Sequence, residues 1–177
     1  ELPYARLAFP CSTSEIMRVG RDDPPRGDSQ MALDRRFFYQ PEQIRSFIDS
    51  VDHPRFGLHL DQMNMVSQET FYHTTDLINR TFDLLADVVA SVHLKDVRCD
   101  YRHMLLKWDE VYIGDGVMDY ETYLRRLAEL PPDTPCFCEH MPEERDYALN
   151  FARLHHLAQK AGTRFLRRGE PYRLAGR

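Results

Sequence analysis

Three residues of metal-ligand type, Asp61, His93 and Glu139, each follow a short apolar segment of the chain. They lie 32 and 46 residues apart, and each interval is close to one strand-and-helix repeat. When parallel strands alternate with helices, the carboxyl ends of the strands meet at one rim, where α/β barrels hold their active sites. Two carboxylates and an imidazole suit Mn²⁺, Mg²⁺ or Zn²⁺ as a ligand set. The spacing therefore predicts one divalent-metal site with these three ligands, rather than three unrelated polar residues that face solvent.

The segments that must position these residues alternate between strand and helix patterns. Predicted strands cover residues 56–60, 88–92 and 136–138, and a further short strand covers residues 6–9. Apolar residues at helical spacing predict four helices, which begin at Pro41, at a cap on Thr75 or Asp76, near Tyr120 and near Tyr147. This order predicts βαβ units and a parallel sheet with right-handed crossovers.

The regular pattern does not extend over the whole chain. Residues 1–37 contain several prolines and a charged run at residues 21–28, and they show no sustained periodicity. Residues 38–166 carry the alternating strands and helices, and residues 167–177 read as a polar tail. The sequence therefore predicts one α/β domain behind an irregular N-terminal segment.

Composition excludes several classes of protein. The 177 residues include 23 Lys and Arg against 28 Asp and Glu, and the net charge of −5 disfavours non-specific nucleic-acid binding. No apolar stretch is long enough to span a bilayer, and the N-terminus lacks a secretory signal. The four cysteines do not form the pattern of a secreted disulfide framework, and Cys136 and Cys138 are expected to be packing residues. These features predict a cytoplasmic protein that binds neither nucleic acid nor membrane.

Four segments, in chain order, resemble motifs of the xylose-isomerase-like sugar isomerase/epimerase family. Residues 51–65 resemble its sixth strand, and residues 91–96 (Ser-Val-His-Leu-Lys-Asp) resemble its seventh-strand His-x-Lys-Asp motif. Residues 110–120 resemble the Gly-x-Gly-x-x-Asp-Tyr loop that follows, and residues 137–140 (Phe-Cys-Glu-His) resemble its eighth strand. Four motifs in the right order are far more specific than any one of them.

The resemblance implies a (β/α)₈ TIM barrel with one divalent metal held by Glu, Asp, His and Glu on strands five to eight. By position, the three residues named at the outset are the last three ligands, and Glu139 is also the expected catalytic residue. Asn64 matches a position that lines the substrate pocket, and Lys95 and Asp96 are expected to support the site or contact substrate. His140 follows Glu139 on the strand and is therefore expected to point the other way.

The chain departs from this pattern at two places. The best match to strand five is residues 6–10, which contain no acid for the first metal ligand. A complete barrel takes about 250 residues, so the motifs correspond to the last four βα units only, a partial barrel. The inner face of such a half-barrel is expected to expose Val, Leu and Phe side chains. Either a second copy of the chain or a missing N-terminal half is then expected to cover the open edges.

The implied activity is a divalent-metal-dependent sugar isomerase or epimerase that acts through an enediolate on a small carbohydrate or polyol. A polyol dehydratase could use the same groups. A truncated, non-enzymatic half-barrel with weak metal or sugar binding would explain the missing glutamate. An abasic-site endonuclease of the same fold is disfavoured, because the acidic chain lacks a basic DNA-facing surface and the additional ligands of a multi-zinc centre.

Aromatic and histidine pairs elsewhere carry weaker predictions. His155 and His156 are expected on the surface of the last helix. Five aromatic residues are expected either to pack in the core or an interface, or to wall a sugar pocket: Phe37, Phe38, Tyr39, Phe71 and Tyr72.

Overall fold

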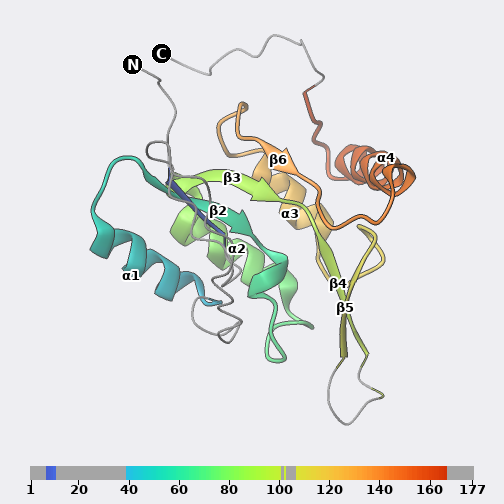
Figure 1. Cartoon of the computed structure of the whole chain (residues 1–177), viewed down its shortest axis with the longest axis horizontal. Coiled ribbons are helices and arrows are strands. Elements are labelled where there is room, and N and C mark those ends of the chain that lie inside the picture. Colours follow the sequence, from blue (N-terminus) through green and yellow to red (C-terminus); the bar gives the residue numbers. More distant parts are fainter. Residues whose placement is uncertain (1–6, 11–38, 101, 103–106, 167–177) are drawn as a thin grey trace.

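The computed structural model of the chain (Figure 1) describes residues 7–10, 39–100, 102 and 107–166. Strands and helices alternate over most of this length, as predicted. The elements, in order, are β1 (Leu7–Pro10), α1 (Pro41–Val51), β2 (Phe56–Asp61), the one-turn helix η1 (Met63–Met65), α2 (Thr74–Leu85), the one-turn helix η2 (Ala86–Val88), β3 (Val89–His93), β4 (Asp96–Asp100), β5 (Lys107–Val111), α3 (Tyr120–Leu127), β6 (Cys136–Phe137) and α4 (Glu144–Lys160). The predicted irregular segment, apart from β1, and the predicted polar tail lie outside the described residues.

Four strands form one parallel sheet in the order β1-β2-β3-β6. Asp61 pairs in register with His93, and His93 pairs with Phe137, so the carboxyl ends of β2, β3 and β6 lie level with one another. Successive helices pack side by side, α1 on α2, α2 on α3 and α3 on α4. This arrangement confirms a partial α/β barrel, in which consecutive βα units form a curved sheet and an outer helical layer.

The sheet has an apolar face and a polar face. Leu58, Leu60 and Val92 are fully buried and belong to one core with the helices. Because side chains alternate along a strand, His59 and Asp61 project from the opposite face of β2. The prediction of exposed Val and Leu on this inner face is therefore wrong for β2 and β3. An exposed Phe is found there, because Phe137 on β6 is 48% exposed.

The ends of three helices are marked by residues that favour a helix start or stop. Pro41 opens α1 at its first turn, and Asp52 ends it in a left-handed conformation (φ 42°). Gly162 follows α4 with φ 73°, as predicted for its stop. Asp119 caps α3 by accepting a hydrogen bond from the Thr122 backbone N–H (3.0 Å).

The predicted cap of α2 is wrong. The helix starts at Thr74 after His73, and no side chain caps it. The two threonines bind the loop before α3 instead: Thr74 donates to the Val117 carbonyl (2.8 Å) and Thr75 donates to the Asp119 carboxylate (2.6 Å). These contacts join the start of α2 to the loop that precedes α3.

An antiparallel hairpin, β4 and β5, interrupts the βα repeat after β3, and it was not among the predicted elements. In Figure 1 the hairpin projects away from the parallel sheet. Val97 and Cys99 are buried while Arg98 between them is exposed, which is the alternation of a strand with one covered face. The hairpin carries Trp108, whose ring packs edge-on against Phe71 (ring centroids 5.8 Å apart).

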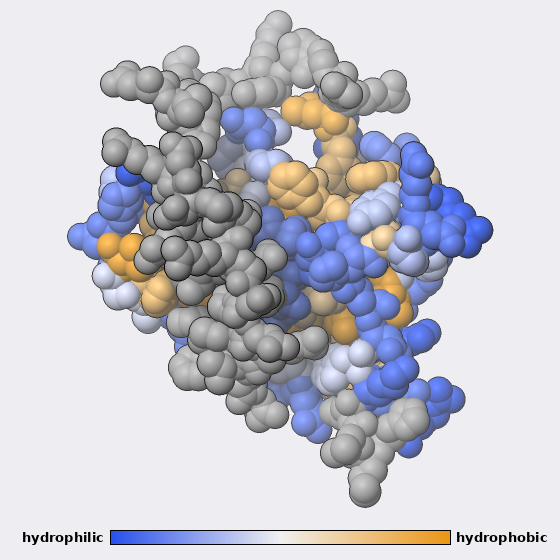
Figure 2. Space-filling model, viewed as in Figure 1, coloured by the Kyte–Doolittle hydropathy of each residue, from blue (hydrophilic) through white to orange (hydrophobic). Residues whose placement is uncertain are grey.

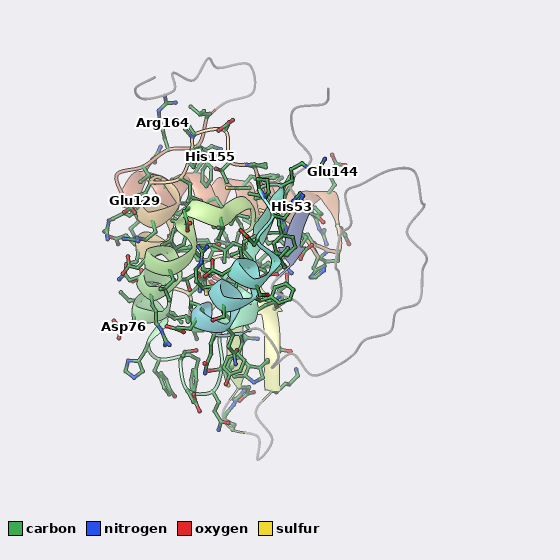
Figure 3. All side chains as sticks on the ribbon, turned by 90° about the vertical axis from the view of Figure 1, so that its left-hand side faces the viewer. His53, Asp76, Glu129, Glu144, His155 and Arg164 are labelled. Carbon is green, nitrogen blue, oxygen red and sulfur yellow. The ribbon has the colours of Figure 1, made fainter. Side chains whose placement is uncertain are left out.

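On the face drawn in Figure 2, hydrophilic and apolar residues lie side by side. The side view in Figure 3 labels six exposed residues at the periphery: His53, Asp76, Glu129, Glu144, His155 and Arg164. His155 and His156 are exposed on α4, as predicted. Among the described helices, none combines the length and the apolar character that a membrane crossing requires.

Candidate metal centre

Three strands bring Asp61, His93 and Glu139 to one point. Asp61 is the last residue of β2, His93 is the last residue of β3, and Glu139 follows β6 by two positions. Each residue offers one ligand atom, and these atoms all lie within 4.8 Å of one another. Among the residues that the structure describes, this is the one group of His, Cys, Asp and Glu side chains with such geometry. The convergence predicted from the spacing is therefore present.

The imidazole of His93 lies between the two carboxylates. Its Nδ1 atom is 3.0 Å from Glu139 Oε1 and 3.6 Å from Asp61 Oδ2. Asp61 is almost fully buried, whereas the Glu139 side chain is 28% exposed at the rim. The group therefore combines a buried carboxylate, Asp61, with a carboxylate that is partly accessible to solvent, Glu139.

Asn64 orients the carboxylate of Asp61. Its side-chain amide donates to Asp61 Oδ2 (2.7 Å), and its backbone N–H lies 3.3 Å from Asp61 Oδ1. The helical turn Met63–Met65 makes this geometry possible, because it returns the chain to the end of β2. The predicted role of Asn64 in substrate binding stays a prediction, and its observed contact is with the predicted ligand.

Lys95 lies in the same group with its ammonium buried. Its Nζ atom is 2.9 Å from Asp61 Oδ2 and also contacts Glu139 Oε1. Burial lowers the pKa of Lys95, but the two carboxylates outweigh burial and raise it overall. For Asp61 the effects have the opposite sign. Burial alone would raise the pKa of this carboxyl, but its hydrogen bond to His93 and the nearby Lys95 charge outweigh burial and lower the pKa overall. Asp61 is therefore ionised and Lys95 is charged at neutral pH.

Asp96 follows Lys95 but serves the next loop. Its carboxylate oxygens accept backbone N–H groups from four residues: Val97 (2.9 Å), Gly114 (2.9 Å), Gly116 (3.0 Å) and Met118 (3.1 Å). Asp96 is completely buried; this burial raises its pKa, and the four hydrogen bonds partly offset the increase. These contacts show that Asp96 holds in place the loop that contains Gly114 and Gly116 (the glycine loop), while the predicted contact of Asp96 with a substrate stays a prediction. The Gly-x-Gly spacing thus has a structural explanation.

His59 belongs to the polar face next to His93, and it was not among the predicted site residues. The two imidazole rings meet edge to face with centroids 3.9 Å apart, and His59 Nδ1 is hydrogen-bonded to Ser91 Oγ. Burial and the neighbouring His93 lower the pKa of His59 to about 4. His59 is therefore a neutral ring beside His93. The signal that could have found it is the alternation Leu58-His59-Leu60-Asp61, which places it on the face of Asp61.

His140 does not point away from Glu139 as expected. The strand ends at Phe137, and His140 has a left-handed backbone (φ 59°), so strand alternation no longer applies. Its Nε2 atom lies 3.6 Å from Glu139 Oε1, and its Nδ1 atom lies 3.0 Å from Glu110 Oε2 on β5. His140 therefore links Glu139 to the β4–β5 hairpin.

The other predicted residues that the structure describes are not part of the group formed by Asp61, His93 and Glu139. Cys136 and Cys138 are partly buried against the core, as predicted, and burial raises the pKa of each thiol to about 11. Phe71 packs on Tyr72 (ring centroids 3.8 Å apart), so these two aromatic residues pair with each other. Phe37 and Phe38 lie outside the described residues.

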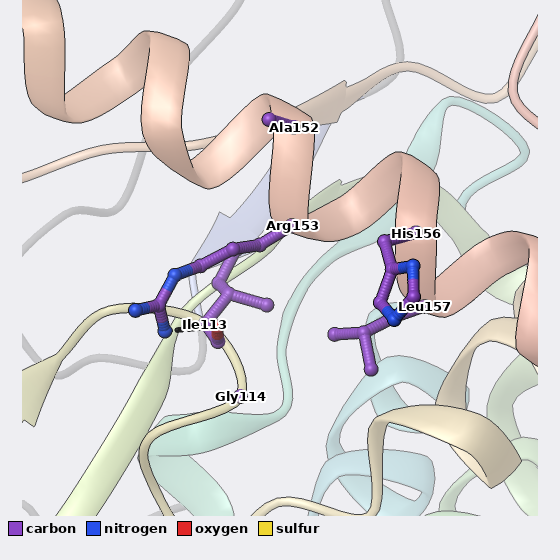
Figure 4. A pocket seen from close by; sticks show the side chains of 6 residues that line it. All are labelled: Ile113, Gly114, Ala152, Arg153, His156 and Leu157. Atoms are coloured by element: carbon purple, nitrogen blue, oxygen red, sulfur yellow. Dashed lines mark hydrogen bonds between the residues drawn. The ribbon is translucent and has the colours of Figure 1, made fainter.

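A pocket beside α4 is lined by none of the three candidate ligands. It measures about 360 Å³ and lies between α4 and the glycine loop (Figure 4), lined by Ile113, Gly114, Ala152, Arg153, His156 and Leu157. Arg153 is already engaged, because it donates to the Ile113 carbonyl (3.0 Å) and pairs with Asp115 (2.6 Å).

Comparison with known proteins identifies the fold family. The family model of the xylose isomerase-like TIM barrel matches residues 31–165. A xylose isomerase domain protein from Planctomyces limnophilus is 27% identical, with a TM-score of 0.54, over 70% of this chain and 43% of that chain. A xylose isomerase-like TIM barrel protein from Mycobacterium smegmatis, solved in complex with magnesium, is 18% identical, with a TM-score of 0.51, over 71% of this chain and 41% of that chain.

The chain therefore spans less than half the length of these two solved relatives. A search of curated proteins by sequence found no significant match. The match to the family model nevertheless covers well over half of the chain, and the parallel sheet agrees with it. On this basis the chain belongs to the xylose isomerase-like TIM barrel family.

Proposed function

We propose that this chain carries the metal-binding rim of a sugar isomerase or epimerase, which acts through an enediolate on a small carbohydrate or polyol. One observation carries the proposal: Asp61, His93 and Glu139 converge at the carboxyl ends of three parallel strands. That rim is the functional face of this barrel architecture.

The donor set fits a divalent cation such as Mn²⁺, Mg²⁺ or Zn²⁺. It combines two carboxylates with an imidazole, and these ligand types suit hard and borderline cations. Asp61 is ionised and its carboxylate is held by Asn64, so one ligand is oriented before any cation arrives. The magnesium bound by the Mycobacterium smegmatis protein is in line with this choice of cations.

The chemistry would be proton transfer next to a carbonyl carbon. A divalent cation bound here would polarise the carbonyl oxygen and stabilise the negative charge of the enediolate. Glu139, the more exposed carboxylate, would remove the proton from the carbon beside the carbonyl and return it. His93 and Asp61, the latter oriented by Asn64, would hold the cation in position. Lys95 would contribute a positive charge close to the developing oxyanion.

Proton exchange with solvent tests this proposal directly. The chain is incubated in D₂O with Mn²⁺ and a panel of aldoses and ketoses, and NMR follows deuterium at the carbon beside the carbonyl. We expect exchange with at least one sugar and its loss in Glu139→Gln. Exchange that persists in Glu139→Gln would contradict the assigned role, and no exchange with any sugar would contradict the activity of this chain.

A non-enzymatic half-barrel is the second candidate, and β1 favours it. This strand lies beside β2, and its residues Leu7–Pro10 contain no acidic residue that could act as a ligand from that position. A protein of this kind would bind metal or sugar weakly without catalysing exchange. The D₂O experiment combined with a metal titration separates the two candidates.

A further inference from the structure

The ammonium group of Lys95 lies among the atoms that would coordinate the metal. Lys95 lies in the two-residue connection between the end of β3 at His93 and the start of β4 at Asp96. Its Nζ atom contacts Asp61 Oδ2 and Glu139 Oε1, and His93 Nδ1 lies close to these same two oxygens. The lysine is therefore bound by two of the three predicted ligands.

A divalent cation and the Lys95 ammonium cannot share these oxygens favourably. Both would be cations within a few ångströms of each other in a buried site, where screening by water is weak. The Lys95 side chain is 3% exposed, so solvent does not separate the charges. Coordination of Asp61 Oδ2 and Glu139 Oε1 by a metal would therefore compete with the ammonium group and repel it.

The connection of Lys95 to the fold permits such a movement. The Tyr120 hydroxyl donates to the Lys95 carbonyl (2.7 Å), and Tyr120 is itself buried, so the backbone is fixed. The long side chain has several rotatable bonds between this fixed backbone and the ammonium. The charged end can therefore change position while the strand end stays in place.

We propose that Lys95 is a built-in counter-cation that exchanges with the metal: it neutralises Asp61 and Glu139 in the metal-free protein, and metal binding releases it toward the open rim. The inference rests on the metal site of the proposed function. It explains how two carboxylates stay close together, one of them almost fully buried, before a cation binds. It also gives the released ammonium access to a bound sugar, in agreement with the predicted substrate contact of Lys95.

The first test measures Mn²⁺ affinity after removal of the competing charge. Lys95→Met and Lys95→Gln are titrated with Mn²⁺ by calorimetry beside the wild-type chain, with Lys107→Met as the control for an exposed lysine. Both Lys95 variants should bind Mn²⁺ at least about tenfold more tightly, because the metal no longer displaces a cation. Equal or weaker binding would overturn the exchange while leaving the metal site itself intact. If wild type and variants all fail to bind Mn²⁺, the metal site of the proposed function fails with it.

The second test uses the unmodified chain, so it does not depend on the folding of a variant. The sequence contains three lysines, Lys95, Lys107 and Lys160, and the last two are exposed. Acetic anhydride labelling followed by mass spectrometry measures the reactivity of each lysine with and without Mn²⁺. Saturation with Mn²⁺ should increase labelling of Lys95 several-fold and leave Lys107 and Lys160 unchanged. Unchanged labelling of Lys95 in the metal-saturated chain would overturn the release.

Discussion

At the scale of single residues, the proposed metal centre depends on the groups that hold its candidate ligands as much as on the ligands themselves. Asp61 receives two hydrogen bonds from Asn64, and the ring of His93 rests edge to face on His59. Such supporting contacts fix the orientation of ligands and tune their affinity for metal. The residues around the centre should therefore affect metal binding even where they contribute no ligand atom.

His93→Ala should abolish metal binding and leave the fold intact. The substitution removes one of three ligands, while His93 lies on the polar face of the sheet and outside the apolar core. We expect a loss of Mn²⁺ affinity of more than about a hundredfold, measured by calorimetry, with an unchanged circular dichroism spectrum. His155→Ala, on the exposed face of α4, is the control. Unfolding of His93→Ala with unchanged metal content would show a structural histidine instead.

Asn64→Ala should weaken metal binding without abolishing it. The substitution removes the 2.7 Å hydrogen bond that orients Asp61 Oδ2, and the ligand itself remains. A loss of about tenfold in Mn²⁺ affinity is expected for a partner of this kind. Gln68→Ala, an exposed polar residue in the same segment, should bind as the wild type does. An Asn64→Ala protein with wild-type affinity would show that Asp61 needs no such support.

At the scale of elements, one buried carboxylate organises the loop between the hairpin and α3. The four backbone N–H groups that Asp96 accepts include those of Gly114 and Gly116. A Cβ atom at Gly116 would lie 2.1 Å from Asp96 Oδ1 and 2.5 Å from the Val97 carbonyl oxygen. The loop therefore tolerates no side chain at Gly116.

Gly116→Ala should destabilise the protein by about 1–3 kcal/mol, because the added methyl group forces Asp96 or the β4 backbone to move. Urea unfolding, followed by circular dichroism, measures this loss. Asp115→Ala in the same loop removes only a partly exposed ion pair with Arg153, so it should change the unfolding free energy by less than about 1 kcal/mol. Equal stability of the two variants would contradict the close contact.

The elements also show what could be predicted from sequence and what could not. The strand ends at Asp61 and His93 were predictable, because apolar strands at repeat spacing imply a parallel sheet whose carboxyl ends align. The β4–β5 hairpin was not, because Arg98 and Lys107 give it the composition of a loop, and its pairing is a tertiary contact. The support of Asp61 by Asn64 depends on a helical turn after β2, which periodicity over three residues cannot reveal.

At the scale of the whole molecule, the described parallel sheet has β1 and β6 as its outer strands. Outer strands present unpaired backbone groups, and proteins normally cover them. Phe137 on β6 is 48% exposed beside the proposed metal centre. The sheet therefore also presents an apolar side chain that a second protein surface could cover. The chain spans less than half the length of the two solved relatives described above.

We expect the 177-residue chain to associate in solution. Sedimentation velocity at micromolar concentration should show dimers or larger species, because pairing covers the outer strands and Phe137. Phe137→Ser should shift the distribution toward smaller species, whereas Phe151→Ser, an equally exposed residue on α4, should not. A monomer at all concentrations would mean that the outer strands are covered within the chain.

The most direct test of the central claim is the stoichiometry of metal binding. The wild-type chain and the double variant Asp61→Asn/Glu139→Gln are dialysed against Mn²⁺, and the bound metal is measured by elemental analysis. A centre formed by these residues predicts one Mn²⁺ per wild-type chain and essentially none in the double variant. Equal metal content in the two proteins, or no bound metal in the wild type, would contradict the centre.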